Sequence, residues 1–334
     1  MLDRKFVVEN AERVKDNCAK REAKADVDRF LAIEADRRKL QASIDQLNQQ
    51  ANAVSKSIGQ AKDAAEREAR KEEGRRLREQ VTAVSDQLKL ATDDGDAILR
   101  MIPNLTHPGA PIGGEDAARE LKRGKTPVPK FSFKPLDHVA IAEKLDLIDF
   151  DGGAKVAGHG FYFLKNDAVL LELALQQYAI DKLMREGFTP TITPDLARNE
   201  ILSGIGFIPR GPETQIYSVD GTDLSLVATA EITLGGLLSD TILEAEQLPI
   251  KMCGISHCYR TEAGAHGKAT RGLYRVHQFT KVEMFAFTQP EESDKTLDDF
   301  CRLECEIFDG LGIPYRVIDT ASGDLGGPAY RKFD

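Results

Sequence analysis

Two heptad patterns near the N-terminus most strongly limit what this chain can fold into. In each, apolar or small residues recur at alternating intervals of three and four, as on helices that pack along a narrow seam. The first seam is interrupted only by Arg37. Its other members are Phe30, Ile33, Leu40, Ile44, Leu47, Ala51, Val54 and Ile58, and the second seam consists of Leu77, Val81, Val84, Leu88, Ala91, Gly95, Ile98 and Ile102.

Between the seams lies Gly59 to Gly74, a heavily charged segment without a recognisable seam. Two seams of similar length on either side of such a segment predict two antiparallel helices folded on each other, with the coiled coil at about 28–102. At about 1.5 Å per residue, each helix would extend roughly 40 to 45 Å. Such an arm suits either reaching a distant partner or dimerisation, and the pattern alone leaves both open.

Arginines gather at and just beyond the tip of this arm, mixed with glutamates. A mixture of this kind is usually a solvated face, and a nucleic-acid surface is the alternative. The net charge of −9 argues against general polyanion binding, but affinity for nucleic acid follows local clusters of phosphate contacts. The basic residues in question are Arg67, Arg70, Lys71, Arg75, Arg76 and Arg78.

Composition predicts a globular, cytoplasmic protein of two domains. The 334 residues are 41% hydrophobic and 30% charged, which is enough to bury a sizeable core. No run of about 18 apolar residues suits a membrane span, and the N-terminal sequence lacks the apolar core of a signal peptide.

The cysteines do not indicate a disulfide framework, because there are five and none forms a CxxC pair. Cys301 and Cys305 lie four apart on a predicted helix. We interpret them as small buried hydrophobes, with metal binding together with His257 as the alternative.

A second region follows Pro103, which ends the second helix of the arm. The Pro- and Gly-rich stretch after it predicts a boundary near residues 105 to 110, and hence domains at 1–105 and 106–334. The second domain mixes helices and strands. We expect a helix at Asp167 to Glu186 with Asp167 as its N-cap, strands at Phe188 to Pro194, Gln215 to Val219 and Leu224 to Ala228, and a helix beginning at the N-cap Thr229.

The stretch from Cys258 to Phe287 carries charge where a strand pattern expects a buried face. Arg260 and Glu262 lie two apart, as do Phe279, Lys281 and Glu283. If both flanks are strands, each set shares one face of the sheet. Both charge signs on one face suit a site for a zwitterionic or polyanionic small molecule, and a solvated, salt-bridged hairpin is the alternative. The glycine-rich segment Ala263 to Leu273 would be the connecting loop.

The order of these pieces resembles one family. The predicted helix and the strand ending at Pro194 are similar to motif 1 of a class II aminoacyl-tRNA synthetase, and RTEAG followed by QFTKVEMF is similar to motif 2. The preceding helical arm, the TAE segment at Thr229 to Glu231 and the stretch TRGLYRVHQFTKVE resemble seryl-tRNA synthetase of the bacterial type. The resemblance implies an α+β fold: an antiparallel two-helix arm that binds tRNA, then a catalytic domain with an antiparallel β-sheet flanked by helices.

The resemblance also implies roles for residues. Arg260 is similar to the catalytic arginine that binds the α-phosphate of ATP and the carboxylate of the amino acid. The implied ATP-binding residues are Arg260, Thr261, Glu262, Arg275 and Phe279, with adenine stacked on Phe279 and its amine at Glu262. The implied serine-binding residues are Thr229, Ala230, Glu231, Arg260 and Glu283, and the implied tRNA contacts are Arg67, Arg70, Arg75, Lys268 and Arg271.

The implied function is a serine–tRNA ligase that uses ATP and Mg²⁺ to form seryl-adenylate and passes the serine to tRNA(Ser). A symmetric dimer through Asp167 to Pro194 is also implied. A non-catalytic synthetase-like protein that binds RNA or a partner is the alternative, although Arg260, Glu262, Phe279 and Glu283 are all present. A ligase that charges a carrier protein is disfavoured, because the resemblance there lacks such an arm.

The C-terminal end departs from the family pattern. The family continues past the segment GDLGG at Gly323 to Gly327 with a metal ligand, a serine contact and motif 3, none of which follows before Asp334. The domain would therefore be incomplete at its C-terminus, and no metal ligand is predicted within this chain. We expect a fragment or a shortened product with weak or no adenylation activity, an expectation that robust serine-dependent ATP–pyrophosphate exchange would overturn.

Overall fold

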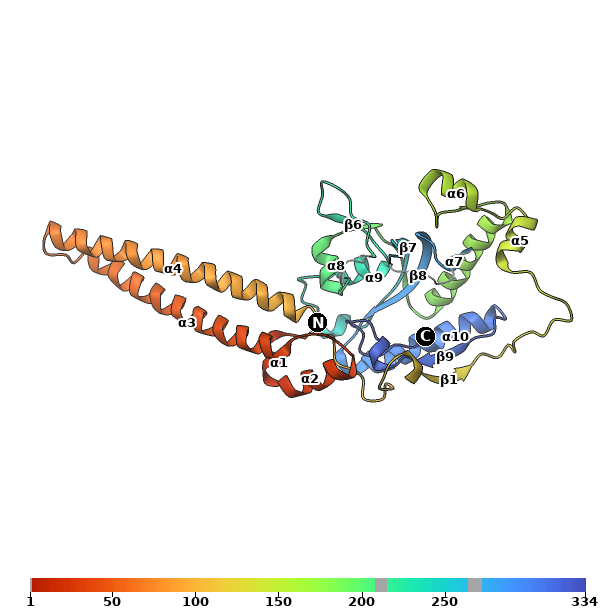
Figure 1. The fold of residues 1–334 in the computed structure, drawn as a ribbon, viewed down its shortest axis with the longest axis horizontal. Helices are drawn as coiled ribbons and strands as arrows, with labels where there is room; N and C mark the ends of the chain where they lie inside the picture. The colour runs from red at the N-terminus through yellow and green to blue at the C-terminus, as the bar shows by residue number, and fades with distance from the viewer. Residues whose placement is uncertain (1, 208–214, 264–271) are drawn as a thin grey trace. The chain divides into compact units, whose positions relative to one another are not determined.

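The computed structural model describes residues 2–207, 215–263 and 272–334. The chain divides into two compact units, residues 1–121 with 318–334 and residues 122–317 (Figure 1). The predicted division at residue 105, which separates a tRNA-binding region from a catalytic region, is a statement about function and stays a prediction.

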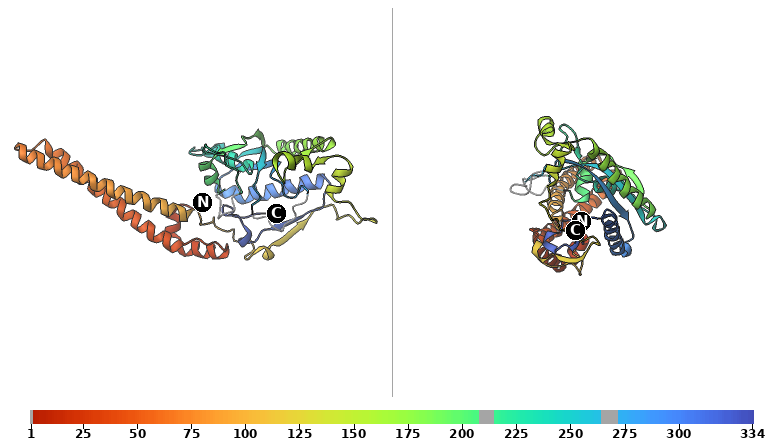
Figure 2. Two further views of the ribbon diagram at one scale, coloured as in Figure 1. Left: turned by 45° about the horizontal axis from the view of Figure 1, so that its top comes forward. Right: turned by 90° about the vertical axis from the view of Figure 1, so that its right-hand side faces the viewer.

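The first unit contains the predicted arm. Helices α3 (Val27–Ile58) and α4 (Ala64–Leu99) lie side by side in all views (Figures 1 and 2). Every predicted seam position is buried or half-buried, because each seam faces the other helix. Helices of 32 and 36 residues extend about 48 and 54 Å at 1.5 Å per residue, longer than predicted.

The prediction of a seamless tip at Gly59 to Gly74 was wrong for most of its length, since α4 already begins at Ala64. Asp63 caps this helix by accepting a hydrogen bond from the amide of Glu66 at 2.8 Å. The seam continues through Glu66 and Arg70, and the Arg70 guanidinium donates to the carbonyl of Ser57. Polar residues occupy these positions, so an apolar periodicity does not reveal them.

The base of the arm forms a small core that the seams did not predict. Two short helices, α1 (Arg4–Glu9) and α2 (Ala11–Lys20), bring Val7 and Val14 against Phe30 and Ile102. Arg21 follows α2 and donates hydrogen bonds to main-chain carbonyls of the C-terminal segment, among them Gly326 at 2.6 Å. The arm is therefore rooted in a packed base within its own unit.

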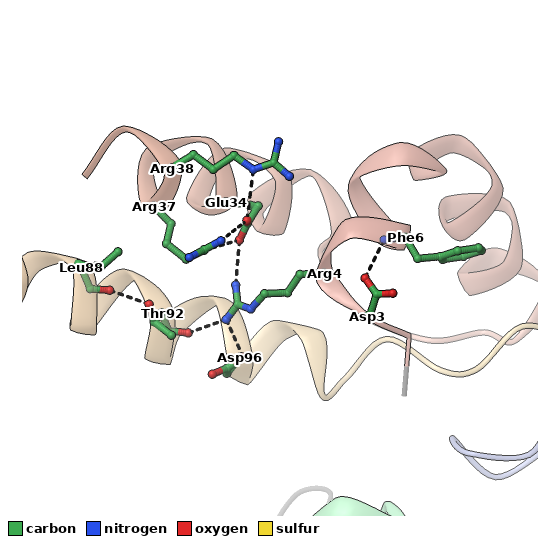
Figure 3. Close-up of polar contacts among 9 residues, drawn as sticks. All are labelled: Asp3, Arg4, Phe6, Glu34, Arg37, Arg38, Leu88, Thr92 and Asp96. Carbon is green, nitrogen blue, oxygen red and sulfur yellow. Dashed lines mark hydrogen bonds and ion pairs between the residues drawn. The ribbon is translucent and has the colours of Figure 1, made fainter. Parts of the chain in front are cut away.

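A buried ion cluster explains the charged residue in the first seam (Figure 3). The side chain of Glu34 is only 3% exposed and accepts hydrogen bonds from Arg37 at 2.8 Å and from Arg4 at 2.9 Å. Arg4 also reaches Asp96 of α4 at 2.6 Å. Hydrogen bonds from the guanidinium groups, of which that of Arg37 has the largest effect, lower the pKa of the Glu34 carboxyl to about 2. Burial of the carboxyl acts in the opposite direction and raises its pKa.

The second unit is built on a three-stranded sheet in the order β4-β7-β8. Strand β7 (Ile250–Tyr259) pairs antiparallel with β8 (Gln278–Phe287) as predicted, and the edge strand β4 (Thr189–Ile192) joins parallel to β7. Helices α7 (Asp167–Arg185) and α10 (Ser293–Gly310) pack on one face, and α9 (Ala230–Gly236) packs on the other.

The remaining elements are short. Strands β2 (Ile148–Asp149) and β3 (Phe163–Leu164) pair with each other, as do β5 (Leu196–Arg198) with β6 (Leu224–Leu226) and β1 (Arg119–Arg123) with β9 (Arg316–Asp319). The other helices are α5 (His138–Lys144), α6 (Phe150–Ala157) and α8 (Asn199–Ile205), with 3-10 turns at Glu115–Ala117, Ala245–Gln247, Pro290–Glu292 and Ser322–Asp324.

Three local predictions differ from the structure. The segment Gln215 to Val219 is not a strand and contributes one isolated bridge, from Ser218 to Ser225. The predicted strand at Leu224 to Ala228 shortens to β6. Asn166, not Asp167, is the N-cap of α7, with a positive φ of 50°. Within the described residues, no helix is both long and apolar enough to cross a membrane.

Candidate functional site

The hairpin of β7 and β8 places the predicted charged residues on its α9 face. Gly254 pairs with Glu283 and Ser256 with Lys281 in the antiparallel register. Gly254 has no side chain, and a Cβ there would lie 2.7 Å from Leu234 and 2.9 Å from Ala230. The glycine therefore lets α9 approach the sheet closely enough to contact Glu283.

Glu283 joins three groups that the sequence places far apart. One carboxylate oxygen accepts hydrogen bonds from the hydroxyl of Thr229 and from the amide of Glu231, the latter at 3.0 Å. The other oxygen accepts from Lys281 at 2.9 Å. Thr229 also caps α9 as predicted, since its hydroxyl accepts from the amide of Glu231 at 3.3 Å.

A second carboxyl group, that of Glu231, lies beside this cluster. Burial raises the pKa of Glu231 above its ordinary value; the nearby Glu283 carboxylate adds to the rise, and Lys281 opposes it. This half-buried cluster contains two carboxyl groups but one lysine. It therefore favours binding of a further cation, such as an ammonium group. The side chain of Ala230 is fully buried in the core between α9 and the sheet, and its role in serine binding stays a prediction.

Arg260 and Phe279 meet at the open end of the hairpin. The guanidinium carbon of Arg260 lies 5.1 Å from the centroid of the Phe279 ring, a cation–π distance. Arg260 directly follows the last residue of β7, and its amide donates to the carbonyl of His277 at 3.0 Å. The contact between this arginine and this aromatic ring was not predicted, although both residues were assigned to the site.

Glu262 departs from the strand that the alternation predicted. Its φ is 50°, in the left-handed region, because the chain turns away from β8 after Arg260. Its carboxylate pairs with the guanidinium of Arg275 at 2.8 Å. The intervening Thr261 donates its amide to the carbonyl of Gln215 at 3.2 Å. The five predicted ATP-binding residues thus lie at the same end of the hairpin, although only two belong to its strands or their direct continuation.

The predicted tRNA contacts fall in two places. Arg67, Arg70 and Arg75 lie on α4, where Arg67 and Arg75 are exposed and Arg70 is half-buried. Arg75 pairs with Glu72 at 3.1 Å. Lys268 and Arg271 lie outside the described residues.

Sequence reasoning missed the surroundings of Arg260. The imidazole of His277 lies 2.8 Å from the carbonyl of Arg260 and 3.0 Å from the hydroxyl of Tyr217, and its ring stacks on Phe161 at 5.2 Å. The only available signal was the position of His277, two residues before Phe279 in the same strand pattern.

The described residues contain no cluster of three or more histidine, cysteine or acidic side chains arranged to hold a metal ion. Cys301 and Cys305 both lie on α10, and burial raises the pKa of the Cys301 thiol to about 11. Cys305 is buried and Cys301 is half-buried, so the interpretation as a buried hydrophobe fits Cys305 better than Cys301.

Family models match two parts of the chain. Residues 1–106 match the seryl-tRNA synthetase N-terminal domain, and residues 216–334 match the class II tRNA synthetase core domain of the G, H, P, S and T group. Over the whole chain, the serine–tRNA ligase of Rhodopirellula baltica is 58% identical and that of Treponema denticola is 50% identical. The chain spans 78% and 79% of these relatives.

Solved structures give the same result. The seryl-tRNA synthetase of Pyrococcus horikoshii, determined with ATP, is 34% identical with a TM-score of 0.88, over all of this chain and 80% of that one. The cytoplasmic serine–tRNA ligase of Naegleria fowleri, determined with AMP, is 30% identical with a TM-score of 0.80, over 97% of this chain and 75% of that one. The chain therefore belongs to the seryl-tRNA synthetase family.

Proposed function

We propose that this chain carries the serine- and ATP-binding machinery of a serine–tRNA ligase. The reaction joins L-serine to ATP, supplied as its magnesium complex, to give seryl-adenylate and pyrophosphate. The seryl group then passes to the terminal ribose of tRNA(Ser). The observation that carries the proposal is the convergence of Thr229, Glu231 and Glu283 beside Arg260 and Phe279 on one face of the hairpin.

The carboxylates of Glu231 and Glu283 form the amino-acid end of the proposed site. Glu283 accepts hydrogen bonds from both Thr229 and Glu231, so its orientation is fixed before a ligand arrives. The ammonium group of serine would take the place that two carboxyl groups favour, and its hydroxyl would hydrogen-bond within the same cluster. Alanine would leave one of these buried polar groups without a partner, which is the basis for rejecting it.

The open end of the hairpin forms the proposed nucleotide end. Adenine would stack on Phe279, with its amine at Glu262. Arg275 would turn from Glu262 towards the phosphates, because a triphosphate carries more negative charge than a single carboxylate. Binding of ATP therefore has to replace the Glu262–Arg275 ion pair seen at 2.8 Å.

Arg260 lies at the junction of the two substrates. A carboxylate oxygen of serine attacks the α-phosphorus and forms the new P–O bond. The bond from that phosphorus to the bridging oxygen breaks, and pyrophosphate leaves with the electron pair. A guanidinium at this place stabilises the charge that builds up on the α-phosphate, so positioning and electrostatics supply the rate and no side chain has to act as a nucleophile.

The arm is the proposed binding element for tRNA, through phosphate contacts of its exposed arginines. In this proposal, Lys268 and Arg271 contact the acceptor end of the tRNA. The protein acts in the cytoplasm, where its tRNA substrate is used.

The α7–β4 region is the proposed dimer interface. On α7, Leu170 and Leu173 are 65% and 56% exposed, and Ile192 of β4 is 83% exposed. Beside them lies a hollow bordered by Phe161, Tyr162, Val169, Leu173, Ile192 and His257. Exposed apolar residues gathered on neighbouring elements support burial against a second copy.

Equilibrium binding tests the proposed function without requiring turnover. Titration calorimetry of the 334-residue chain with seryl-sulfamoyl-adenosine, a stable analogue of seryl-adenylate, should show saturable binding. The alanyl analogue should bind at least tenfold more weakly, and Arg260→Ala should lose most of the affinity for the seryl analogue. Equal affinity for both analogues would contradict serine selectivity. Binding of tRNA(Ser) without either analogue would favour the non-catalytic alternative.

A further inference from the structure

The hydrogen bonds at the end of the hairpin depart from a regular ladder at one residue pair. The register of β7 and β8 ends at Tyr259 opposite Gln278, so Arg260 and His277 would form the next pair. The amide of Arg260 does donate to the carbonyl of His277 at 3.0 Å. In a regular pair of this type, the amide of His277 would donate back to Arg260. Instead it donates to the carbonyl of Gly160 at 3.0 Å.

The side chain of His277 replaces the missing bond. Its Nδ1 lies 2.8 Å from the carbonyl oxygen of Arg260 and 3.0 Å from the hydroxyl of Tyr217. A carbonyl oxygen can only accept, so Nδ1 must carry the hydrogen. The Tyr217 oxygen can share that hydrogen as a second acceptor. The contacts thus assign the Nδ1–H form of the imidazole.

Two other segments enter where the strands separate. The carbonyl of Gln215 accepts a hydrogen bond from the amide of Thr261. The side-chain amide of Gln215 donates to the carbonyl of Ala263 at 2.9 Å. On the other side, Phe161 stacks on the His277 ring at an interplanar angle of 24°. The imidazole therefore fills the space between β7 and β8 where the two strands separate.

Gly160 leaves only enough room for this ring. A Cβ at Gly160 would lie 2.4 Å from Cδ2 of His277, and the residue has a φ of +85°. The imidazole is thus held by stacking, by close packing and by two polar contacts.

We infer that His277 is a positioning residue for Arg260: its Nδ1–H holds the carbonyl of Arg260 where the hairpin opens and so fixes the direction of the guanidinium over Phe279. The role in catalysis rests on the proposed function, whereas the hydrogen bond itself does not. In this assignment, the effect of His277 on the substrates passes through the main chain of Arg260.

Paired substitutions separate the hydrogen bond from the ring. His277→Phe keeps an aromatic ring but removes the donor, and His277→Asn restores a side-chain N–H near the position of Nδ1. Calorimetry with seryl-sulfamoyl-adenosine should show about tenfold weaker binding for His277→Phe and recovery of most of the loss for His277→Asn. Tyr217→Phe should bind nearly as the wild type, because the bond to Arg260 remains.

A glycine pair tests the packing independently. Gly160→Ala should weaken binding as His277→Phe does, because the new methyl group displaces the imidazole. Gly312→Ala is the control: Gly312 also has a positive φ, of +67°, but a Cβ there would meet nothing within 4 Å. Both variants place an alanine at a positive φ, so both should lower the melting temperature, but only Gly160→Ala should also weaken ligand binding.

Nitrogen NMR of the histidine rings tests directly whether Nδ1 of His277 carries the hydrogen. With ¹⁵N-labelled histidine, and His277→Phe to assign the signal, His277 should show a protonated, pyrrole-type Nδ1. A pyridine-type Nδ1, unchanged affinity in His277→Phe, or equal losses in His277→Phe and His277→Asn would overturn the inference. If the wild-type chain does not bind the analogue, the proposed function fails, while the nitrogen signals still decide the placement of His277.

Discussion

In the proposed site, Glu283 is the residue on which the amino-acid end depends. Its two carboxylate oxygens connect the cap of α9 with Lys281 of β8, so a ligand there meets a preformed set of partners. Such preorganisation lowers the cost of binding, because the side chains are ordered before the ligand arrives. Glu231 lies beside it, and Lys281 acts electrostatically on both carboxyl groups.

The raised pKa of Glu231 predicts how serine binding depends on pH. Burial, together with Glu283, makes Glu231 take up a proton at a higher pH than an ordinary glutamate. The protonated group no longer attracts an ammonium ion. Affinity for seryl-sulfamoyl-adenosine should therefore fall as the pH is lowered towards this raised pKa.

The matched variant for this measurement is Glu231→Gln, which should bind more weakly at neutral pH and show a flatter pH profile in calorimetry. Parallel profiles for wild type and variant would contradict the assignment to Glu231.

The raised pKa of Glu231 also affects the stability of the folded state. Between the ordinary and the raised pKa the folded state holds more protons, so this group's contribution to stability falls as the pH rises.

Residue-level prediction from sequence succeeded where alternation applies. Phe279, Lys281 and Glu283 follow the strand period, and their shared face was predictable. Glu262 was not, since a left-handed turn after Arg260 ends the period. The contacts of His277 were also out of reach, because Tyr217 and Phe161 come from segments that no local pattern brings together.

At the scale of elements, the base of the arm depends on the ion cluster around Glu34. Lowering its pKa from 4.5 to about 2 corresponds to roughly 3 kcal/mol of stability at neutral pH. This contribution is complete above the unfolded-state pKa and is lost as the pH falls from about 4.5 towards 2. Glu34→Gln should lower the free energy of unfolding by roughly 2 to 3 kcal/mol at pH 7, less at pH 3.5.

Urea denaturation at both pH values checks this expectation. Glu68→Gln is the control, because Glu68 pairs with Lys71 at 3.1 Å on the exposed surface of α4 and should matter little. A difference between wild type and Glu34→Gln that does not narrow with falling pH would show that the cluster contributes through shape instead of charge.

The exposed arginines of α4 give a prediction for tRNA binding. Arg67→Ala and Arg75→Ala should each weaken binding of tRNA(Ser) several-fold and make its salt dependence shallower by about one unit of slope. Filter binding across a salt series measures both quantities. Lys295→Ala on α10 serves as the control. Unchanged affinity in both arginine variants would remove this part of α4 from the tRNA contact.

The element pattern was largely predictable because each helix of the arm buries one stripe. The tip was misjudged since Glu66 and Arg70 continue the seam with polar side chains. Helices α1 and α2 have only six and ten residues, and their place is set by packing against Phe30 and Ile102. Short helices of this kind depend on tertiary contacts more than on local sequence.

At the scale of the whole molecule, the exposed face of α7 and β4 predicts self-association. Sedimentation equilibrium at micromolar concentration should give a dimer. Ile192→Glu should shift it to a monomer, because a charge would be buried in an apolar interface. Ile242→Glu is the control, since Ile242 is 95% exposed elsewhere in the same unit. A monomeric wild type, or an Ile192→Glu variant that stays dimeric, would contradict the proposed interface.

The whole account depends on one face of one hairpin receiving both serine and ATP. A crystal structure of the chain with seryl-sulfamoyl-adenosine tests this most directly. The account predicts the ammonium group between Glu231 and Glu283, adenine stacked on Phe279, and the sulfamate within hydrogen-bonding distance of the Arg260 guanidinium. A ligand bound on the opposite face of the sheet, with Glu262 still paired to Arg275, would contradict it.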